Sequence, residues 1–267
     1  MAEGTRRTPL SRERVLRAAV ALADGSGAGG AAGGSGSGAG GDGAAGGGAG
    51  VEALSMRKLA QELGVVPMAL YKHVANKEEL LAGMVDAVVG EIDPPAPGAD
   101  WKDVVRQRVL SARRVLRHHP WAPRVIESLP APTPAMLGYL DSVIGTFRSG
   151  GLSADLTHHA MHALGGRVLG FSQELFDASP PGEAPTGQAA PEAAAQAAEL
   201  AARYPYIAEI AASAVHTDGS VISGGCDDQF EFEFALDLLL DGIDSLHRRG
   251  WTSAAHRGSR STASAGG

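Results

Sequence analysis

Residues 54–81 read LSMRKLAQELGVVPMALYKHVANKEELL, and this stretch decides the fold. Residues 55–63 predict a short helix that ends at Gly64, a residue type that commonly terminates helices. The apolar face of that helix consists of Leu59, Ala60 and Leu63. Pro67 stands where a new helix can begin, so residues 68–74 predict a second short helix. Two short helices joined by a glycine turn can place the second helix in the major groove of DNA.

Predicted helices on both sides complete a three-helix unit. Residues 10–23 carry apolar side chains at three- and four-residue spacing, which predicts a helix. Asn76, followed by two acids, predicts the N-cap of a longer helix that runs to about Glu91. Between the first two helices, residues 25–50 are almost entirely Gly, Ala and Ser, so we expect a flexible insertion there without chemistry of its own.

The stretch 54–81 resembles the signature of the tetracycline repressor (TetR) family, LS-x-R-x-LA-x-x-LGV…LY-x-H-x-x-NK-x-x-L. Members of that family usually join their first two helices by only a few residues, so the insertion is a departure. The resemblance implies DNA contacts from the start of the second helix, from the reading helix and its turn, and from the helix that follows. The implied residues are Ser55, Met56, Arg57, Met68, Ala69, Tyr71, Lys72, His73 and Lys77.

The resemblance also assigns roles within this set. Tyr71 and His73 would meet the DNA backbone, and Lys77 would bind a phosphate. The residues that would face the bases are Met68, Ala69 and Lys72. Because Met68 and Ala69 are apolar, contact with thymine methyl groups is favoured over bidentate hydrogen bonds.

Further helices predicted toward the C-terminus make the chain all-α. Their ranges are 101–119, 122–129, 133–149, 153–176, 191–203, 206–214 and 227–249. We therefore expect a helix-turn-helix DNA-binding domain at 1–92, a larger helical effector-binding and dimerisation domain at 93–250, and a disordered tail at 251–267.

The C-terminal half resembles the tetracycline repressor core more weakly, and an effector pocket is implied by that resemblance. The implied lining is Arg108, Ala112, Trp121, Ile126, Val143, Phe147, His158, Met161, His162 and Gly165. The position of the family's metal-binding histidine falls on Ile126, so we expect neither a metal site nor a cofactor. His158 and His162 share a helix face, but without a third ligand a pocket or surface role is favoured over metal binding.

The last predicted helix has a broad apolar surface, formed by Phe230, Phe234, Leu238, Leu239, Ile243 and Leu246. A homodimer interface would bury it, whereas the alternative is a helix buried wholly in its own core. A dimer would also hold two reading helices about 34–36 Å apart, the spacing of successive major grooves in a palindromic operator.

Composition limits the class of protein. The single cysteine, Cys226, and the absence of a long apolar stretch lead us to expect a cytoplasmic protein without a membrane segment, associated with the nucleoid when bound to DNA. The net charge is −7, yet residues 1–80 hold nine Lys/Arg against eight Asp/Glu. We expect a ligand-responsive repressor rather than an enzyme; the alternative is a helical ligand-binding enzyme or an interaction protein without a DNA function.

Overall fold

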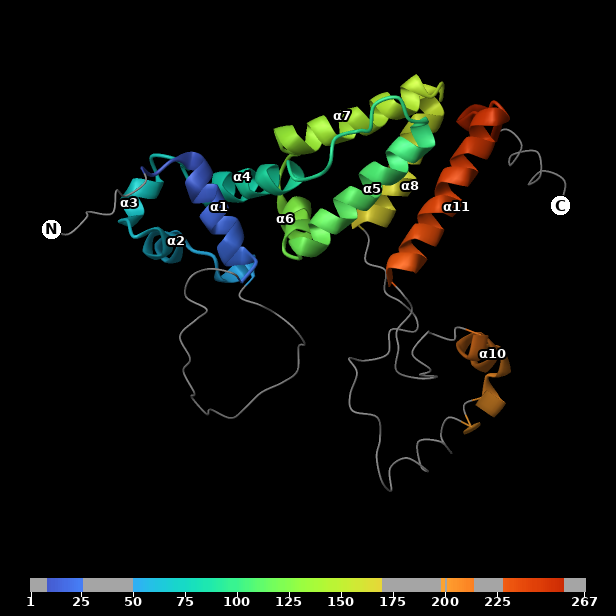
Figure 1. The fold of residues 1–267 in the computed structure, drawn as a ribbon, viewed down its shortest axis with the longest axis horizontal. Coiled ribbons are helices and arrows are strands. Elements are labelled where there is room, and N and C mark those ends of the chain that lie inside the picture. The colour runs from blue at the N-terminus through green and yellow to red at the C-terminus, as the bar shows by residue number, and fades with distance from the viewer. Residues whose placement is uncertain (1–8, 26–49, 170–197, 200, 214–227, 257–267) are drawn as a thin grey trace. The chain divides into compact units, whose positions relative to one another are not determined.

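The computed structural model describes residues 9–25, 50–169, 198–199, 201–213 and 228–256. Within these ranges every regular element is a helix, which confirms the predicted all-α class (Figure 1). The chain divides into two compact units, residues 1–169 with 243–267 and residues 170–242. Most of the predicted insertion at 25–50 lies outside the described residues.

The first helix, α1, spans Arg12–Ala23 and begins slightly later than the predicted Leu10. Ser11 is its N-cap, and the Ser11 hydroxyl accepts a hydrogen bond from the backbone N–H of Arg14 at 3.2 Å. This bond satisfies one of the N–H groups that the first turn of a helix leaves unpaired. The predicted apolar face is buried and consists of Val15, Leu16, Ala19 and Leu22.

The second helix, α2, spans Met56–Leu63, in close agreement with the sequence. Its N-cap Ser55 accepts a hydrogen bond from the backbone N–H of Lys58 at 3.2 Å. Gly64 ends the helix with φ of 65°, a left-handed conformation that explains why glycine stands there. A short 3-10 helix at Val51–Ala53, which the sequence did not predict, precedes α2.

The α-helix α3 spans only Pro67–Leu70, so the predicted helix at 68–74 was too long. The backbone continues as hydrogen-bonded turns, with His73 N–H donating to Leu70 O at 2.8 Å and Val74 N–H donating to the same oxygen at 3.0 Å. The helix stops because Asn76 takes an extended conformation, φ −157°, to cap the next helix. That helix, α4, spans Lys77–Val89 and ends shortly before the predicted Glu91.

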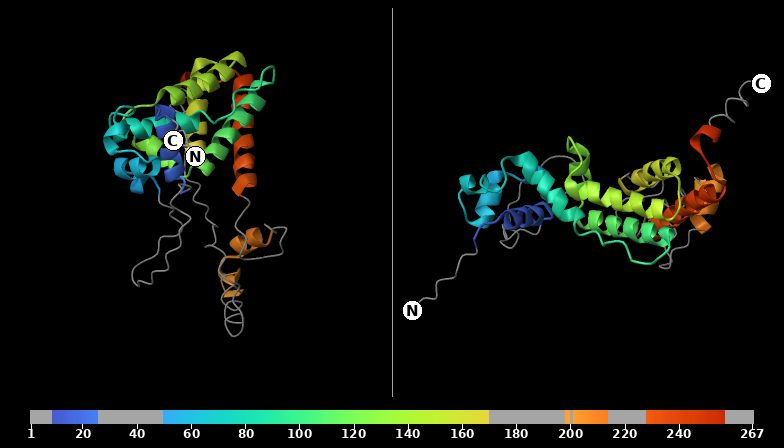
Figure 2. Two further views of the ribbon diagram at one scale, coloured as in Figure 1. Left: turned by 60° about the vertical axis from the view of Figure 1, so that its left-hand side comes forward. Right: turned by 90° about the horizontal axis from the view of Figure 1, so that it is seen from above.

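The following helices are α5 at Trp101–His118, α6 at Ala122–Ser128, α7 at Pro134–Ser149 and α8 at Ala154–Leu169. Helices α5 and α7 lie side by side, and α8 packs against both (Figure 2). The predicted extension of α8 to Phe176 lies outside the described residues. Close packing of α5 on α7 requires Gly150, because a Cβ at that position would lie 2.5 Å from the Trp101 ring.

One hydrophobic core joins α1–α4 to the neighbourhood of α6. The buried side chains that α5 and α6 and their connection add to this core are Val115, Trp121, Ala122 and Val125. Helix α6 also contacts α4 directly. A displacement of α6 therefore disturbs the packing of the helix-turn-helix, because a close-packed interior transmits small shifts.

Two further helices belong wholly or mostly to the second unit. Helix α10 spans Pro205–Ser213 and matches the predicted helix at 206–214. Helix α11 spans Asp228–Arg248 and matches the predicted final helix. Only 198–199 and 201–203 of the predicted helix at 191–203 are described, and these residues are helical.

The beginning of the predicted disordered tail, 251–267, is ordered instead. Residues 253–256 form a helical turn, and the backbone N–H of Ser253 donates to Asp155 Oδ2 at 2.7 Å. The Trp251 ring packs against the His159 ring with their centroids 5.4 Å apart. Contacts with α8, which the local sequence does not display, order these residues. The segment beyond residue 256 lies outside the described residues.

Candidate nucleic-acid interface and effector core

The predicted DNA contacts lie on the surface around α2, α3 and the start of α4. The exposed members are Ser55, Arg57, Met68, Tyr71, Lys72 and Lys77, and the half-buried ones are Met56, Ala69 and His73. Met68 is 71 % exposed, and Tyr71, three residues later, is 45 % exposed. The turn from α3 into α4 thus brings the reading residues onto one short, contiguous segment.

Buried neighbours hold this segment in place. Leu70 and Val74 alternate with the exposed reading residues and are 0 % and 1 % exposed. Leu59 and Leu80 anchor the helices on either side and are equally buried. The backbone that carries the reading residues is therefore fixed by apolar packing, while their side chains remain available to a partner.

Val66 is a candidate contact that the sequence analysis missed. It is the N-cap of α3 and its side chain is 68 % exposed, next to Met68 on the leading end of the reading helix. Its position in the turn gave no reason to assign it a role. The available signal was the presence of an apolar residue directly before the helix-starting Pro67, where a solvent-facing turn would favour a polar side chain.

Glu79 joins three parts of the DNA-reading region. Its backbone N–H donates to Asn76 Oδ1 at 2.7 Å, and its carboxylate accepts from the backbone N–H of Ala75 at 2.7 Å. This variant of the capping box, in which the carboxylate accepts from the residue before the N-cap, fixes the turn between α3 and α4. Arg12 on α1 adds an ion pair, with 3.7 Å between Arg12 Nη2 and Glu79 Oε1. From the sequence, Glu79 was recognisable only as an acid in the first turn of α4.

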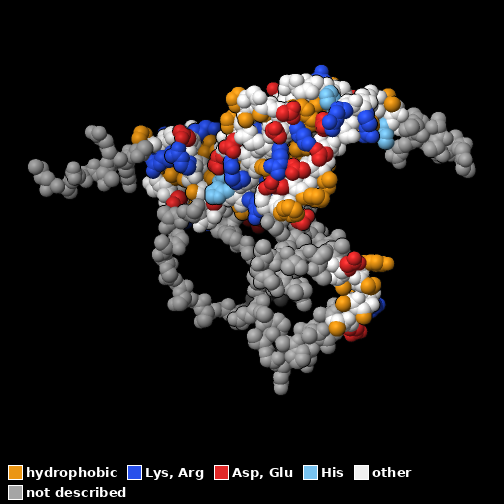
Figure 3. Space-filling view, turned by 45° about the vertical axis from the view of Figure 1, so that its right-hand side comes forward, with side chains coloured by type: hydrophobic (Ala, Val, Ile, Leu, Met, Phe, Trp, Pro, Cys, Tyr) orange, Lys and Arg blue, Asp and Glu red, His pale blue; other side chains and the backbone are white. Residues whose placement is uncertain are grey.

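The reading segment carries exposed cations. Arg57, Lys58, Lys72 and Lys77 are all exposed, and so is the acid Glu78. On the face in Figure 3, basic side chains are interspersed with acidic ones. Exposed cations attract the phosphates of DNA.

The implied effector-pocket residues separate into three places. Arg108 and Ala112 on α5, with Val143 and Phe147 on α7, are buried together between those helices. Trp121 is buried and Ile126 half-buried in the core that includes α1–α4. The third group lies on α8, where His158, His162 and Gly165 are exposed and Met161 is half-buried.

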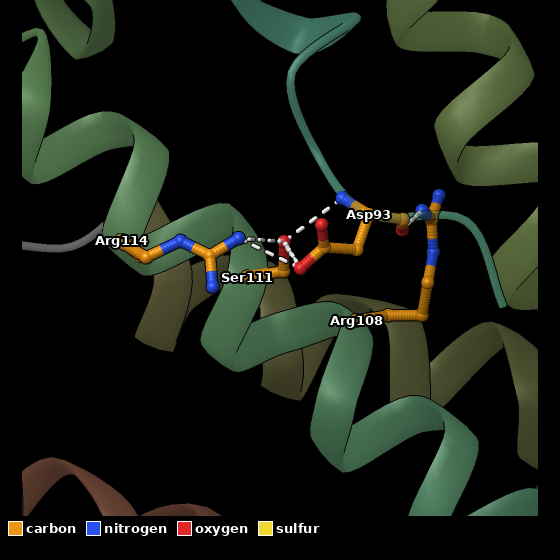
Figure 4. A network of polar contacts seen from close by, with 4 residues as sticks. All are labelled: Asp93, Arg108, Ser111 and Arg114. Carbon is orange, nitrogen blue, oxygen red and sulfur yellow. Dashed lines mark hydrogen bonds and ion pairs between the residues drawn. The ribbon is translucent and has the colours of Figure 1, made fainter. Parts of the chain in front are cut away.

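Arg108 is the polar centre of the α5–α7 group (Figure 4). Its side chain is buried, it donates to the backbone oxygen of Asp93, and its guanidinium carbon lies 4.6 Å from the centroid of the Tyr139 ring. Burial raises the pKa of Tyr139 above its ordinary value. Arg108 Nε is buried and has no hydrogen-bond partner among the described residues. Such a group is available to a ligand that brings an acceptor.

Asp93 organises the exposed side of the same network (Figure 4). Asp93 Oδ2 accepts hydrogen bonds from Arg114 Nη2 at 2.7 Å and from Ser111 Oγ at 2.9 Å. The hydrogen bond from Arg114, and then that from Ser111, lower the pKa of Asp93. Asp93 thereby connects the segment after α4 to α5 and holds its backbone oxygen against Arg108.

Two family descriptions match this chain. The one described as "Tetracyclin repressor-like, C-terminal domain" matches residues 94–246, and the one described as "Bacterial regulatory proteins, tetR family" matches residues 47–84. The chain belongs to the TetR family. The first match covers more than half of the chain, and the second covers the helix-turn-helix that the sequence predicted.

Two named repressors resemble this chain, one over most of its length and one over a quarter of it. It is 29% identical over 251 residues to the HTH-type transcriptional repressor DrrR1 of Streptomyces coeruleorubidus, covering 90% of this chain and 80% of DrrR1. Over 70 residues it is 37% identical to the tetracycline repressor protein class D of Escherichia coli, which covers 25% of this chain and 32% of that protein.

Among solved structures, the TetR family protein ActR of Streptomyces coelicolor in complex with (S)-DNPA matches with a TM-score of 0.55. It has 25% sequence identity, and the match covers 90% of this chain and 100% of ActR. This TetR-family chain is therefore a DNA-binding transcriptional regulator, and its named relatives are regulators rather than enzymes. The alternative of a helical protein without a DNA function is not favoured.

Helix α11 has an exposed apolar face and a buried apolar face. On α11, Phe230, Phe234 and Leu238 are 62%, 53% and 58% exposed. Ile243, which the sequence analysis placed in the same apolar surface, is 6% exposed and belongs to the buried face, so that prediction was wrong for Ile243. The buried face consists of Phe232, Leu236, Leu240 and Ile243.

The histidines of α8 form a ring cluster. The His158 and His162 ring centroids are 4.6 Å apart in an edge-to-face arrangement. In the described part of the chain, no group of three or more His, Cys, Asp or Glu side chains is arranged to hold a metal ion.

Among the described helices, none is both long enough and apolar enough to cross a membrane.

Proposed function

We propose that the chain is a homodimeric repressor that binds a palindromic operator through residues 1–92 and leaves it when a small molecule binds within residues 93–250. The observation that carries this proposal is the exposure of Met68, Tyr71 and Lys72 on a backbone anchored by Leu70 and Val74. A surface of this kind is held rigidly for a partner that the isolated chain lacks.

The proposed roles of individual residues are those that the family resemblance implies, and their exposure supports them. Met68, Ala69 and Lys72 face the base edges, with Val66 beside them. Tyr71 and His73, in the turn after α3, meet the sugar-phosphate backbone, and Lys77 binds a phosphate at the start of α4. At the start of α2, Ser55, Met56 and Arg57 add contacts from the second helix. Phosphate contacts position the protein, whereas the base contacts select the sequence.

The dimer is supported by the exposed apolar stripe on α11. Phe230, Phe234 and Leu238 follow one another at four-residue spacing, and the first two rings are stacked with centroids 6.5 Å apart. A stripe of this size is costly to leave in water, and a second copy of the same helix would cover it across a two-fold axis. The dimer in turn sets the separation of the two reading helices.

The proposed effector binds among the α5–α7 residues, with Arg108 as its polar anchor. The TetR-family relative ActR was solved in complex with the small molecule (S)-DNPA. In this chain the unpaired Arg108 Nε favours an effector with an acidic or carbonyl oxygen, and the Tyr139 ring favours one with a planar ring system. His158, Met161, His162 and Gly165 lie on the surface of α8 and would border the effector only if the dimer encloses them.

The proposed repressor acts in the cytoplasm and associates with the nucleoid while it occupies its operator. Effector binding releases it because the effector binds the DNA-incompetent arrangement more tightly than the competent one. Catalysis, a cofactor and a metal ion have no part in this mechanism.

Genome-wide selection of DNA fragments by the purified protein, read by sequencing, tests the proposal. Wild type is expected to enrich one palindromic site, and Tyr71→Ala and Lys77→Ala are expected to lose that enrichment. Lys102→Ala is the matched control, because it removes the same charge from α5, away from the reading segment. Enrichment of no site by wild type, or equal loss with Lys102→Ala, would contradict the proposal.

A further inference from the structure

A buried histidine, His119, lies between two carboxylates that come from different helices. His119 is the C-cap of α5, and its side chain is 3% exposed. Its Nδ1 lies 2.9 Å and 3.0 Å from the two carboxylate oxygens of Asp24, and its Nε2 lies 3.2 Å from Glu91 Oε2. The Asp24 side chain is 15% exposed and that of Glu91 is 51% exposed.

Both ring nitrogens of His119 face carboxylate oxygens, which only accept hydrogen bonds. The other groups that face the ring are Trp121, whose Nε1 donates to Asp24 Oδ1 at 2.7 Å, and the edge-to-face ring of His118 at 4.7 Å. His119 therefore joins two carboxylates that belong to different parts of the fold.

The three partners lie where the DNA-binding and effector regions meet. Asp24 is the C-cap of α1, and Glu91 follows the end of α4. His119 and Trp121 flank Pro120 in the connection from α5 to α6. The Glu52–Arg124 ion pair also joins the two regions, but its side chains are 80% and 79% exposed, so water and salt weaken it.

We infer that His119 is the positioning residue that couples the effector region to the DNA-reading helices, because its ring clamps the ends of α1 and α4 to the connection between α5 and α6. A shift of this connection on effector binding is carried to both helices through the clamp. The inference rests on the proposed function, in which α1–α4 read DNA. It adds the residue through which the orientation of that region is controlled.

Distance measurements between two spin labels test the clamp without DNA. The labels occupy Gln61→Cys on α2 and Asp141→Cys on α7, both exposed, in a Cys226→Ser background. Labelled chains are diluted into unlabelled protein so that only distances within one chain are observed. Four proteins are compared: the otherwise unmodified chain, His119→Gln, Asp24→Asn, and the control His118→Gln, which changes the exposed neighbouring histidine.

The reference protein and His118→Gln should give one narrow distance distribution. His119→Gln should give a broad distribution, because the ring that joins Asp24 to Glu91 is lost. A merely structural role would lower the free energy of unfolding and leave the distance distribution of the folded protein narrow. If His119→Gln does not fold, Asp24→Asn carries the same expectation. A narrow distribution in either folded variant would overturn the inference.

Operator binding by the same variants, without labels, separates this inference from the proposed function. His119→Gln should weaken operator affinity roughly three- to thirtyfold, the range over which coupling residues act, and His118→Gln should leave it within twofold. If no protein binds an operator while the distances still depend on His119, the proposed function fails and the clamp stands. If wild type binds and His119→Gln matches it in affinity and distance, the clamp fails alone.

Discussion

The DNA-reading segment and the α5–α7 core differ in how their residues come together. The reading residues lie within positions 55–77, and local turns bring them onto one surface. The core residues are far apart in sequence and meet only through helix packing, as Arg108 on α5 and Tyr139 on α7 illustrate. A site formed by consecutive turns depends on capping and turn residues, whereas a site between helices depends on packing.

The largest effect on stability should follow removal of a core ring. Phe147→Ala should lower the free energy of unfolding by about 3–5 kcal/mol, because Phe147 is 0% exposed and packs on Trp101 with a centroid separation of 5.6 Å. Met68→Ala, in the reading segment, should change it by less than about 0.5 kcal/mol. Denaturant titration measures the free energy of unfolding of both variants. Similar losses of stability in the two would contradict the expected difference between the core and the reading segment.

A smaller effect is expected where the core has no room for a methyl group. Gly150→Ala should lower the free energy of unfolding by about 1–3 kcal/mol, because the new Cβ would lie 2.5 Å from the Trp101 ring. Gly138→Ala, also in α7, meets nothing within 4 Å and should raise it by up to about 1 kcal/mol. Thermal unfolding compares them, and shifts of the same sign would show that space around Trp101 is not the cause.

In the reading segment, we expect stability to fall when the cap of α4 is removed, since this cap fixes the turn between α3 and α4. Glu79→Ala removes the acceptor for the Ala75 N–H and should lower the free energy of unfolding by about 1 kcal/mol, while also weakening operator binding. Glu78→Ala is the control, since it removes the same charge from an exposed neighbouring position. Equal operator affinities for the two variants would mean that the capping box does not orient the reading residues.

The smallest effect concerns the exposed ion pair at the edge of the core. The pKa of Asp93 is lowered below its ordinary value of 3.8, chiefly by Arg114, so the ionised form stabilises the fold at neutral pH, and this contribution is lost as the pH falls through the lowered pKa. Asp93→Asn should therefore be slightly less stable than wild type at pH 7 and equal to it in strong acid. Unfolding curves at several pH values test this, and a difference that persists in acid would exclude the ion pair as its source.

The same difference between the regions explains what the sequence could predict. Ser55, Gly64, Pro67 and Asn76 specify helix ends through local chemistry, so both ends of α2 and the starts of α3 and α4 were predicted to within about a residue. The end of α3 was misplaced, because Leu70 and Val74 keep an apolar spacing beyond the last α-helical residue.

In the core, the helices were predictable and their contacts were not. The sequence placed Trp121 in the effector pocket, whereas Trp121 is buried in the core that includes α1–α4 and donates to Asp24. The His119 clamp joins residues 24, 91 and 119, which share no motif or spacing. Contacts over such sequence separations depend on the packing of whole helices, which periodicity does not determine.

The salt dependence of operator affinity tests most directly the claim that residues 54–81 bind DNA. Each phosphate contact contributes nearly one unit to the slope of log affinity against log salt concentration. Lys77→Ala should reduce the magnitude of that slope by about two, because each protomer of the proposed dimer loses one phosphate contact, whereas Lys102→Ala should leave it unchanged. A slope that is the same for wild type and Lys77→Ala, or that changes equally with Lys102→Ala, would contradict the placement of DNA at the reading segment.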